Sequence, residues 1–200
     1  MILVTVILMA LFGLLILGGR IERLVHVKLR HTWIAPLAFG AQWWSIFWPL
    51  SRDERLAGAQ AAMMLLSLLL ATGFLWLNRA QPGFKLLAVG MALNLAVMAA
   101  NGGYMPITLQ AMERSGDIHL VESTEPGSRI QNTKNVLLPK DETRLWILSD
   151  IFVVPLPPPF RGVFSPGDAI IALGAVWFLR TYLFHPHLGS NGGVACLREA

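Results

Sequence analysis

The sequence contains few charged residues and a single cysteine. Charged residues make up 14% of its 200 positions, against about 25% in soluble domains. Cys196 has no second cysteine to pair with, which excludes a secreted domain held together by internal disulfides. Hydrophobic residues make up 54% of the chain, and the mean hydropathy is +0.56. This balance excludes a cytosolic enzyme and a nucleic-acid-binding module, and it predicts an integral membrane protein.

The motifs of soluble catalysis are also absent from the sequence. There is no G-x-S-x-G, no phosphate-binding Gly-Lys loop and no H-E-x-x-H, which argues against hydrolase or nucleotide chemistry of the soluble type. His185 and His187 form a pair with no third ligand nearby, so we predict no metal site and no cofactor. A membrane enzyme, whose motifs can be sparse, stays open.

Long apolar runs fill most of the chain. A membrane-spanning helix needs about 20 mostly apolar residues, and five runs approach that length. They cover residues 1–18, 32–50, 56–77, 84–100 and 167–184. The predicted fold class is therefore all-α, a polytopic membrane helix bundle of about five transmembrane helices in one domain over residues 1–184. Residues 185–200 are predicted to be a loose C-terminal tail.

The longest segment between these runs is residues 101–166, which we predict to be an extracytoplasmic loop. Within it, Thr108 is placed to cap a short helix over residues 109–115, with Gly116 as its stop. Four prolines exclude a regular spanning helix between residues 145 and 164: Pro155, Pro157, Pro158 and Pro159. We expect this Pro-rich segment to lie on the membrane surface or to re-enter the membrane.

The basic residues predict the orientation of the bundle. The net charge is +4, and cations lie in short blocks between the apolar runs, as in membrane proteins. The strongest block is residues 20–30, directly after the first run. Part of this block alternates as a strand would, but we favour an amphipathic helix on the membrane surface because a lone strand has no partner. The positive-inside rule then places the N-terminus outside and the C-terminus in the cytoplasm.

One asparagine lies in the middle of a predicted span. Asn94 belongs to the fourth apolar run, and for it we favour an interhelical hydrogen bond over a role as a ligand. The same run carries small residues at four-residue spacing, which would let another helix approach closely. These residues are Ala88, Ala92, Ala96 and Ala100. The predicted partners are thus the lipid bilayer and a membrane protein bound through this alanine face, with no nucleic acid.

Three polar residues near the predicted outer face are candidates for catalysis: Asn101, Asp150 and Asp168. Asp168 follows Ser165 and Pro166, a pattern typical of a capped helix start. Asp150 has no such local role, and Arg144 and Arg161 are its candidate ion-pair partners. We expect Asn101, Asp150 and Asp168 to lie close together beneath the Pro-rich segment.

Three stretches of the chain resemble a known family. They are N-L-A-V-M-A-A-N-G-G-Y-M-P from Asn94, S-D-I-F-V-V-P-L-P-P-P from Ser149 and F-S-P-G-D-A-I-I-A-L-G from Phe164. Together with the opening G-G-R-I-E-R-L, they are similar to domain-of-unknown-function family 5317, although Ser149 stands where the family pattern has glycine. The resemblance implies a bacterial plasma-membrane protein and no particular reaction.

Three functions are consistent with these patterns. The first is a non-enzymatic packing or accessory membrane protein, favoured by the alanine face and the missing catalytic motifs. The second is a membrane enzyme acting on lipid or polyprenyl head groups at the outer face, favoured by the three polar candidates. The third is a small transporter, favoured by the Pro-broken segment before a short last helix.

Overall fold

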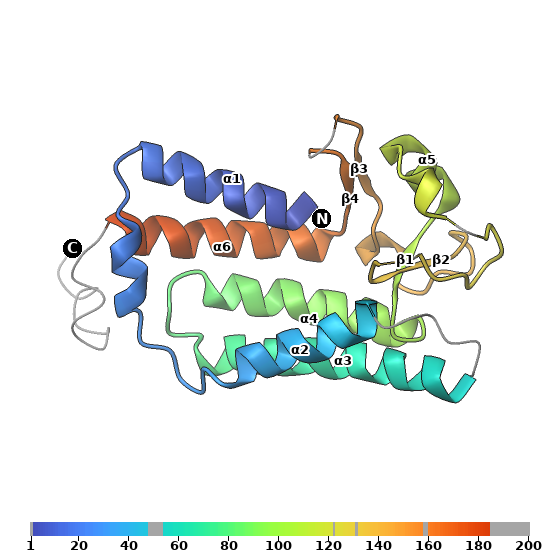
Figure 1. Cartoon of the computed structure of the whole chain (residues 1–200), viewed down its shortest axis with the longest axis horizontal. Coiled ribbons are helices and arrows are strands. Elements are labelled where there is room, and N and C mark those ends of the chain that lie inside the picture. Colours follow the sequence, from blue (N-terminus) through green and yellow to red (C-terminus); the bar gives the residue numbers. More distant parts are fainter. Residues whose placement is uncertain (1, 48–53, 122, 131, 158–159, 185–200) are drawn as a thin grey trace.

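A computed structural model describes residues 2–47, 54–121, 123–130, 132–157 and 160–184. The predicted tail, residues 185–200, lies outside the described residues. The described chain is mostly helical, and five long helices run back and forth with roughly parallel axes (Figure 1). They are α1 (Ile2–Ile16), α2 (Ile34–Phe47), α3 (Glu54–Leu77), α4 (Phe84–Ala100) and α6 (Pro166–Phe184). Each packs mainly on its neighbours in the order α1, α6, α4, α3, α2.

These helices form where the apolar runs are, but they differ in length. Two helices of the described chain are long and apolar enough to cross a membrane: α6 and the Ala57–Leu77 part of α3. Helices α1 and α4 are apolar but shorter. At 1.5 Å per residue, α1, α2 and α4 rise only about 21 to 26 Å, less than the roughly 30 Å hydrocarbon core. The presence of five helices is confirmed, whereas five membrane crossings stay a prediction.

The segment between α4 and α6 gathers at one end of the bundle, and we call residues 101–165 the cap (Figure 1). Its elements are β1 (Met105–Ile107), α5 (Leu109–Ser115), η2 (Ile118–Leu120), β2 (Asn135–Leu137), η3 (Trp146–Leu148), β3 (Phe152–Val154) and β4 (Gly162–Phe164). The short helix α5 is confirmed, and Thr108 is its N-terminal capping residue as predicted, since Thr108 Oγ1 accepts from the Ala111 N–H at 3.2 Å. The all-α prediction is wrong here, because the cap contains two small sheets.

The first of these sheets joins distant parts of the cap. Strands β1 and β2 pair in parallel, with Met105 opposite Asn135 and Ile107 opposite Leu137. Strand β2 lies within the segment that the sequence presents as a polar loop. Parallel pairing needs a connection of a dozen or more residues, and α5, η2 and the following turns supply it.

The Pro-rich segment contains the second sheet, which the sequence analysis did not predict. Strands β3 and β4 make an antiparallel hairpin with Val153 opposite Val163. These two valines pack against the cluster Ile107, Ala111, Met112 and Ile130. On the other face of the hairpin, the rings of Phe152 and Phe164 stack with centroids 5.2 Å apart. Pro155 and Pro157 therefore lie in the connection between two paired strands and not in a spanning helix, as predicted, and the place of this segment on or in the membrane stays a prediction.

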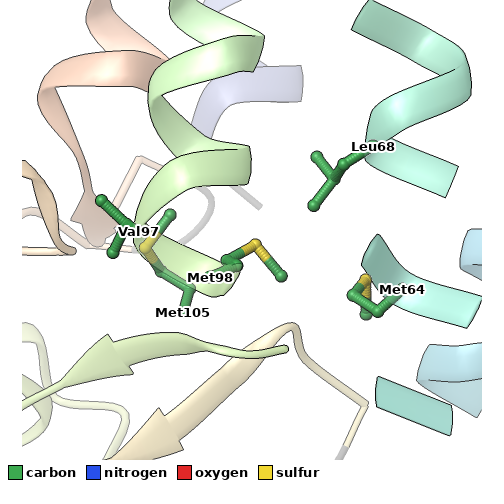
Figure 2. Close-up of a cluster of buried hydrophobic side chains, with 5 residues drawn as sticks. All are labelled: Met64, Leu68, Val97, Met98 and Met105. Atoms are coloured by element: carbon green, nitrogen blue, oxygen red, sulfur yellow. The ribbon is translucent and has the colours of Figure 1, made fainter. Parts of the chain in front are cut away.

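A cluster of flexible apolar side chains joins the cap to the bundle (Figure 2). It consists of Met64 and Leu68 of α3, Val97 and Met98 of α4, and Met105 of β1. Three methionines in one cluster suit an irregular junction, because the unbranched thioether chain fills gaps of uneven shape.

Helices α4 and α6 approach each other through glycine. A Cβ added at Gly90 would lie 2.5 Å from the Gly167 carbonyl oxygen, and one added at Gly174 would lie 2.8 Å from the Gly83 carbonyl oxygen. The two glycines on each helix are seven residues apart, which places them on one face. The predicted alanine face is only partly free for a partner, since Ala92 and Ala96 are exposed whereas Ala88 is buried within the chain. Its use by a partner stays a prediction.

The basic stretch after α1 lies across the end of the bundle opposite the cap. It contains a 3₁₀ helix, η1 (Ile21–His26), which has no buried residue. The predicted short helix is thus present as a 3₁₀ helix and the alternative strand is not formed, while its place on the membrane surface stays a prediction. Hydrogen bonds join this stretch to the ends of α3 and α6. The Asn78 side chain accepts from the Arg30 N–H and donates to the Arg30 carbonyl. Arg23 Nη1 donates to the Leu183 carbonyl at 2.7 Å.

Candidate functional site

Two buried carboxylates share one lysine where the cap meets the bundle. Lys134 Nζ lies 3.2 Å from Asp168 Oδ2 and 3.9 Å from Asp150 Oδ1. Asp150 and Asp168 are 4% and 6% exposed. Lys134 precedes β2, Asp150 follows η3 and Asp168 lies in the first turn of α6. We call these three residues the Asp–Lys–Asp cluster.

Besides Lys134, two residues hold Asp168: Ser165 before α6 and Asn94 of α4. Ser165 caps α6, because its Oγ accepts from the Asp168 N–H at 3.0 Å. The Ser165 N–H points back to Asp168 Oδ2 at 3.4 Å, which completes the reciprocal arrangement of a capping box. From α4, Asn94 Nδ2 donates to Asp168 Oδ1 at 2.7 Å, and Asn94 Oδ1 accepts from Ser165 Oγ at 2.9 Å. The interhelical hydrogen bond predicted for Asn94 is thus present, and the carboxylate of Asp168 is closely surrounded.

Asp150 has fewer partners. Asn135 Nδ2 donates to its Oδ2 at 2.7 Å, and its backbone N–H donates to the Pro106 carbonyl at 3.3 Å. Its Oδ1 is buried and accepts no hydrogen bond from the described residues. Burial raises the pKa of Asp150, and the nearby positive charge of Lys134 only partly opposes this. Asp150 therefore takes up a proton more readily than an aspartate in water.

The charge balance of the cluster indicates which of its residues can exchange a proton. With both carboxylates ionised and Lys134 protonated, one negative charge is left over in a buried place, which is costly. Burial would lower the pKa of Lys134, but the charges of Asp150 and Asp168 outweigh it and raise the pKa. Lys134 therefore keeps its charge, and Asp150 is the group that can exchange a proton. Among the described residues, no three His, Cys, Asp or Glu side chains gather as a metal site would require.

The third candidate residue, Asn101, makes its hydrogen bonds elsewhere. Its Nδ2 donates to the Val97 carbonyl at 2.8 Å and to the Arg144 carbonyl at 2.9 Å, and its Oδ1 accepts from the Arg144 N–H at 3.0 Å. It joins the end of α4 to the backbone before η3. The prediction that three residues lie together is therefore correct for two of them. Asp150 and Asp168 both lie beside Lys134, whereas Asn101 bonds to other groups.

The predicted ion-pair partners of Asp150 are wrong. Arg161 Nε pairs with Asp117 Oδ1 at 2.9 Å and so fastens β4 to the start of η2. Arg144 meets Asn101 through its backbone, and its side chain is exposed. Sequence reasoning missed Lys134 because it lies in a polar segment without local periodicity. The available signal was the position of Lys134 and Asn135 directly before the apolar residues of β2.

A second polar contact holds the cap against α2 and α3. Arg129 donates to Gln60 Oε1 at 3.0 Å and to the Ser45 carbonyl at 3.3 Å, and its guanidinium lies 4.2 Å from the ring centroid of Tyr104. Burial lowers the pKa of Arg129, although an arginine keeps its charge in proteins. Sequence reasoning missed this contact too, because its residues come from separate segments of the chain.

An apolar groove begins beside Asp168. It has a volume of about 710 Å³ and follows α6 from Asp168 to Arg180. One side is formed by Leu3 and Val6 of α1, and the cap end by Val154 and Phe164 of the hairpin. A groove of this volume is within the usual range of ligand-binding sites.

Comparison with known proteins places the chain in a family without an assigned activity. An uncharacterised protein of Thermotoga maritima is 28% identical over 169 residues, which covers 82% of each chain. No solved structure matches. Residues 26–180 match the model of the family of unknown function DUF5317. This segment includes the whole cap, the Asp–Lys–Asp cluster and most of the bundle, and the chain therefore belongs to that family.

Proposed function

We propose that the chain is a multi-pass plasma-membrane protein with a non-enzymatic packing or accessory role. In this proposal α1, α2, α3, α4 and α6 cross the membrane, the N-terminus and the cap lie outside, and the C-terminus is cytoplasmic. The cap is a rigid outer module that the Asp–Lys–Asp cluster fastens to the bundle.

The observation that carries this proposal is the apolar outer surface of the bundle. Each of its five helices exposes large apolar side chains, among them Phe12, Trp43, Leu69, Val89 and Trp177. An apolar surface on every helix of the bundle is typical of contact with a membrane or a partner. The shorter helices fit a bilayer that thins locally around them, at a cost of fractions of a kcal/mol per Å of mismatch.

The basic residues support the proposed orientation. Arg20, Arg30, Arg79 and Lys85 are exposed on the loops and helix ends opposite the cap. Cytoplasmic loops of membrane proteins carry an excess of lysine and arginine, which favours placing this end inside and the cap outside.

The hydrogen bonding of the cluster favours a structural role. Asp168, which would face a substrate in the groove, is already bonded to Asn94, Ser165 and Lys134. A catalytic carboxylate needs an open position for the reacting group. The alanine face of α4 offers a place for a partner, since Ala92 and Ala96 are exposed on a helix that allows close approach.

One observation favours the alternative, an enzyme acting on lipid or polyprenyl head groups. Asp150 Oδ1 has no hydrogen-bond donor among the described residues, and the groove beside Asp168 is apolar. The transport hypothesis has no such support, because the Pro-rich segment on which it depended forms a hairpin of the cap.

Thiol labelling of intact bacteria tests the proposed topology. Cys196→Ser provides a background without cysteine, and Thr124→Cys in the cap and Arg79→Cys between α3 and α4 provide exposed thiols on opposite ends. We expect a membrane-impermeant maleimide to label Thr124→Cys in intact cells and Arg79→Cys only after permeabilisation. The reverse pattern would show that the orientation is wrong, and recovery of the chain in the soluble fraction would show that the membrane assignment is wrong.

The Asp150→Asn variant separates the two roles of the cluster. A structural cluster predicts a changed unfolding temperature and an intact cellular phenotype in the protein that still folds. A catalytic cluster predicts loss of the phenotype at unchanged stability. Asp141→Asn is the matched control, because Asp141 is an exposed aspartate of the same cap.

A further inference from the structure

We propose that the groove along α6 binds one acyl chain of an anionic phospholipid of the cytoplasmic leaflet, with the lipid phosphate on Arg180. The proposal rests on the membrane topology proposed above. It concerns a site that is separate from the Asp–Lys–Asp cluster, although the groove ends next to it.

The shape of the groove fits a lipid tail better than a partner helix. Asp168 and Arg180 are twelve residues apart on α6, which is about 18 Å at 1.5 Å per residue. One leaflet of the hydrocarbon core is about 15 Å thick, half of the total. The hairpin residues Val154 and Phe164 close the cap end. At about 18 Å the groove is too short for a spanning helix of about 30 Å, whereas an acyl chain of about one leaflet in length fits it.

The lining of the groove is suited to hydrocarbon. Between its two charged ends the residues contributed by α6 are apolar, and Ala169 and Ala172 leave room beside α1. Leu173 and Trp177 are 65% and 54% exposed, so the groove is open sideways towards the position of the surrounding lipid. A tail can therefore enter from the bilayer without any movement of the cap.

The charges at the two ends decide the direction of the lipid. A phosphate at the cap end would approach Asp168 and the leftover negative charge of the cluster. At the other end Arg180 is exposed, and no carboxylate of the described residues forms an ion pair with it. It lies one turn before the end of α6, where a long side chain can reach the interface. Arg23 is held at the same helix end through the Leu183 carbonyl, which adds positive charge there.

Lipid retention by the purified full-length chain tests this site. The protein is incorporated into nanodiscs with equal amounts of phosphatidylcholine and phosphatidylglycerol, and the lipid that stays bound after release into detergent is measured by native mass spectrometry. We expect the wild type to retain phosphatidylglycerol preferentially. Arg180→Gln should weaken its retention about tenfold, as expected for the loss of a charge-assisted contact. Ala172→Phe should reduce retention of both lipids by filling the groove.

Two matched variants serve as controls. Arg79→Gln removes another exposed cation from the same end of the bundle, and Ala92→Phe enlarges an exposed alanine on α4. Both should retain lipid as the wild type does. If Arg180→Gln retains phosphatidylglycerol as the wild type does, the proposal is overturned. It is also overturned if the wild type forms a dimer through the groove and Ala172→Phe separates the two copies. If Ala172→Phe fails to fold, Arg180→Gln decides the result. Thiol labelling distinguishes these outcomes from a failure of the membrane assignment itself.

Discussion

Lys134 and Asp168 form the ion pair that joins the cap to the bundle, with Lys134 Nζ 3.2 Å from Asp168 Oδ2. The lysine comes from the start of β2 and the aspartate from the first turn of α6. Because Asp150 Oδ1 lies 3.9 Å from the same ammonium group, Lys134 is the cation shared by both carboxylates. Removing it leaves both of them buried without a cation.

The first prediction concerns the loss of this lysine. Lys134→Met should reduce the free energy of unfolding. Breaking a buried ion pair typically costs roughly 3–5 kcal/mol, and we expect a loss at the lower end of this range because the Lys134 side chain is 26% exposed. Denaturant titration in detergent micelles measures the change. Lys85→Met removes an exposed lysine of α4 and should change the stability by less than about 0.5 kcal/mol. Equal losses in the two variants would contradict the role of Lys134.

The second prediction concerns the pH dependence of stability. Burial raises the pKa of Asp150 in the folded chain above its value in the unfolded chain. A raised folded pKa stabilises the fold fully below the unfolded pKa of about 3.9, and this contribution is lost as the pH rises through the folded pKa. The contribution of Asp150 to the unfolding temperature should therefore fall as the pH rises from about 4.

The variant Asp150→Asn should remove this part of the slope, since asparagine does not titrate. Thermal unfolding of the wild type and the variant at a series of pH values measures the effect. Asp141→Asn, which removes an exposed aspartate of the cap, should keep the slope of the wild type. A slope that is the same in all three proteins would show that Asp150 does not titrate in this range.

The third prediction concerns the contact between α4 and α6. Gly90→Ala should destabilise the protein by about 1–3 kcal/mol, the usual cost of overpacking, because the added Cβ would lie 2.5 Å from the Gly167 carbonyl oxygen. Gly73→Ala in α3 is the matched control. A Cβ at Gly73 has nothing within 4 Å, so alanine should be neutral or should stabilise the helix by up to about 1 kcal/mol. Thermal unfolding that ranks the two variants in the opposite order would contradict this packing.

The fourth prediction concerns Asn94. Asn94→Leu leaves Asp168 Oδ1 and Ser165 Oγ without their partner in α4, which should cost about 1–3 kcal/mol for buried polar groups. Asn101→Leu, at the end of the same helix, removes bonds that are open to solvent and should cost about 1 kcal/mol. Denaturant titration of the two variants compares them. A larger loss for Asn101→Leu would mean that the cap depends on the Arg144 backbone contact more than on the cluster.

The sequence by itself determined the helices. The apolar run over residues 84–100 has the bounds of α4, and the start of α6 at Pro166 follows from the Ser165 cap. Helix α5 ends where Gly116 predicts, with a φ of +76°. These features depend on composition, periodicity and capping within a few residues of each other, and such local signals are visible in a single chain.

The tertiary structure decided which polar groups meet. Lys134 and Asp168 are separated by 34 residues, and no local pattern links them. Arg161, expected at Asp150, pairs with Asp117 because the β3–β4 hairpin places it beside the start of η2. The sequence also did not predict the β3–β4 hairpin, because its prolines exclude a helix but do not indicate which segment pairs with which. Long-range pairing follows from the packing of the whole cap on the bundle, and the cluster therefore exists only once β2, η3 and α6 have come together.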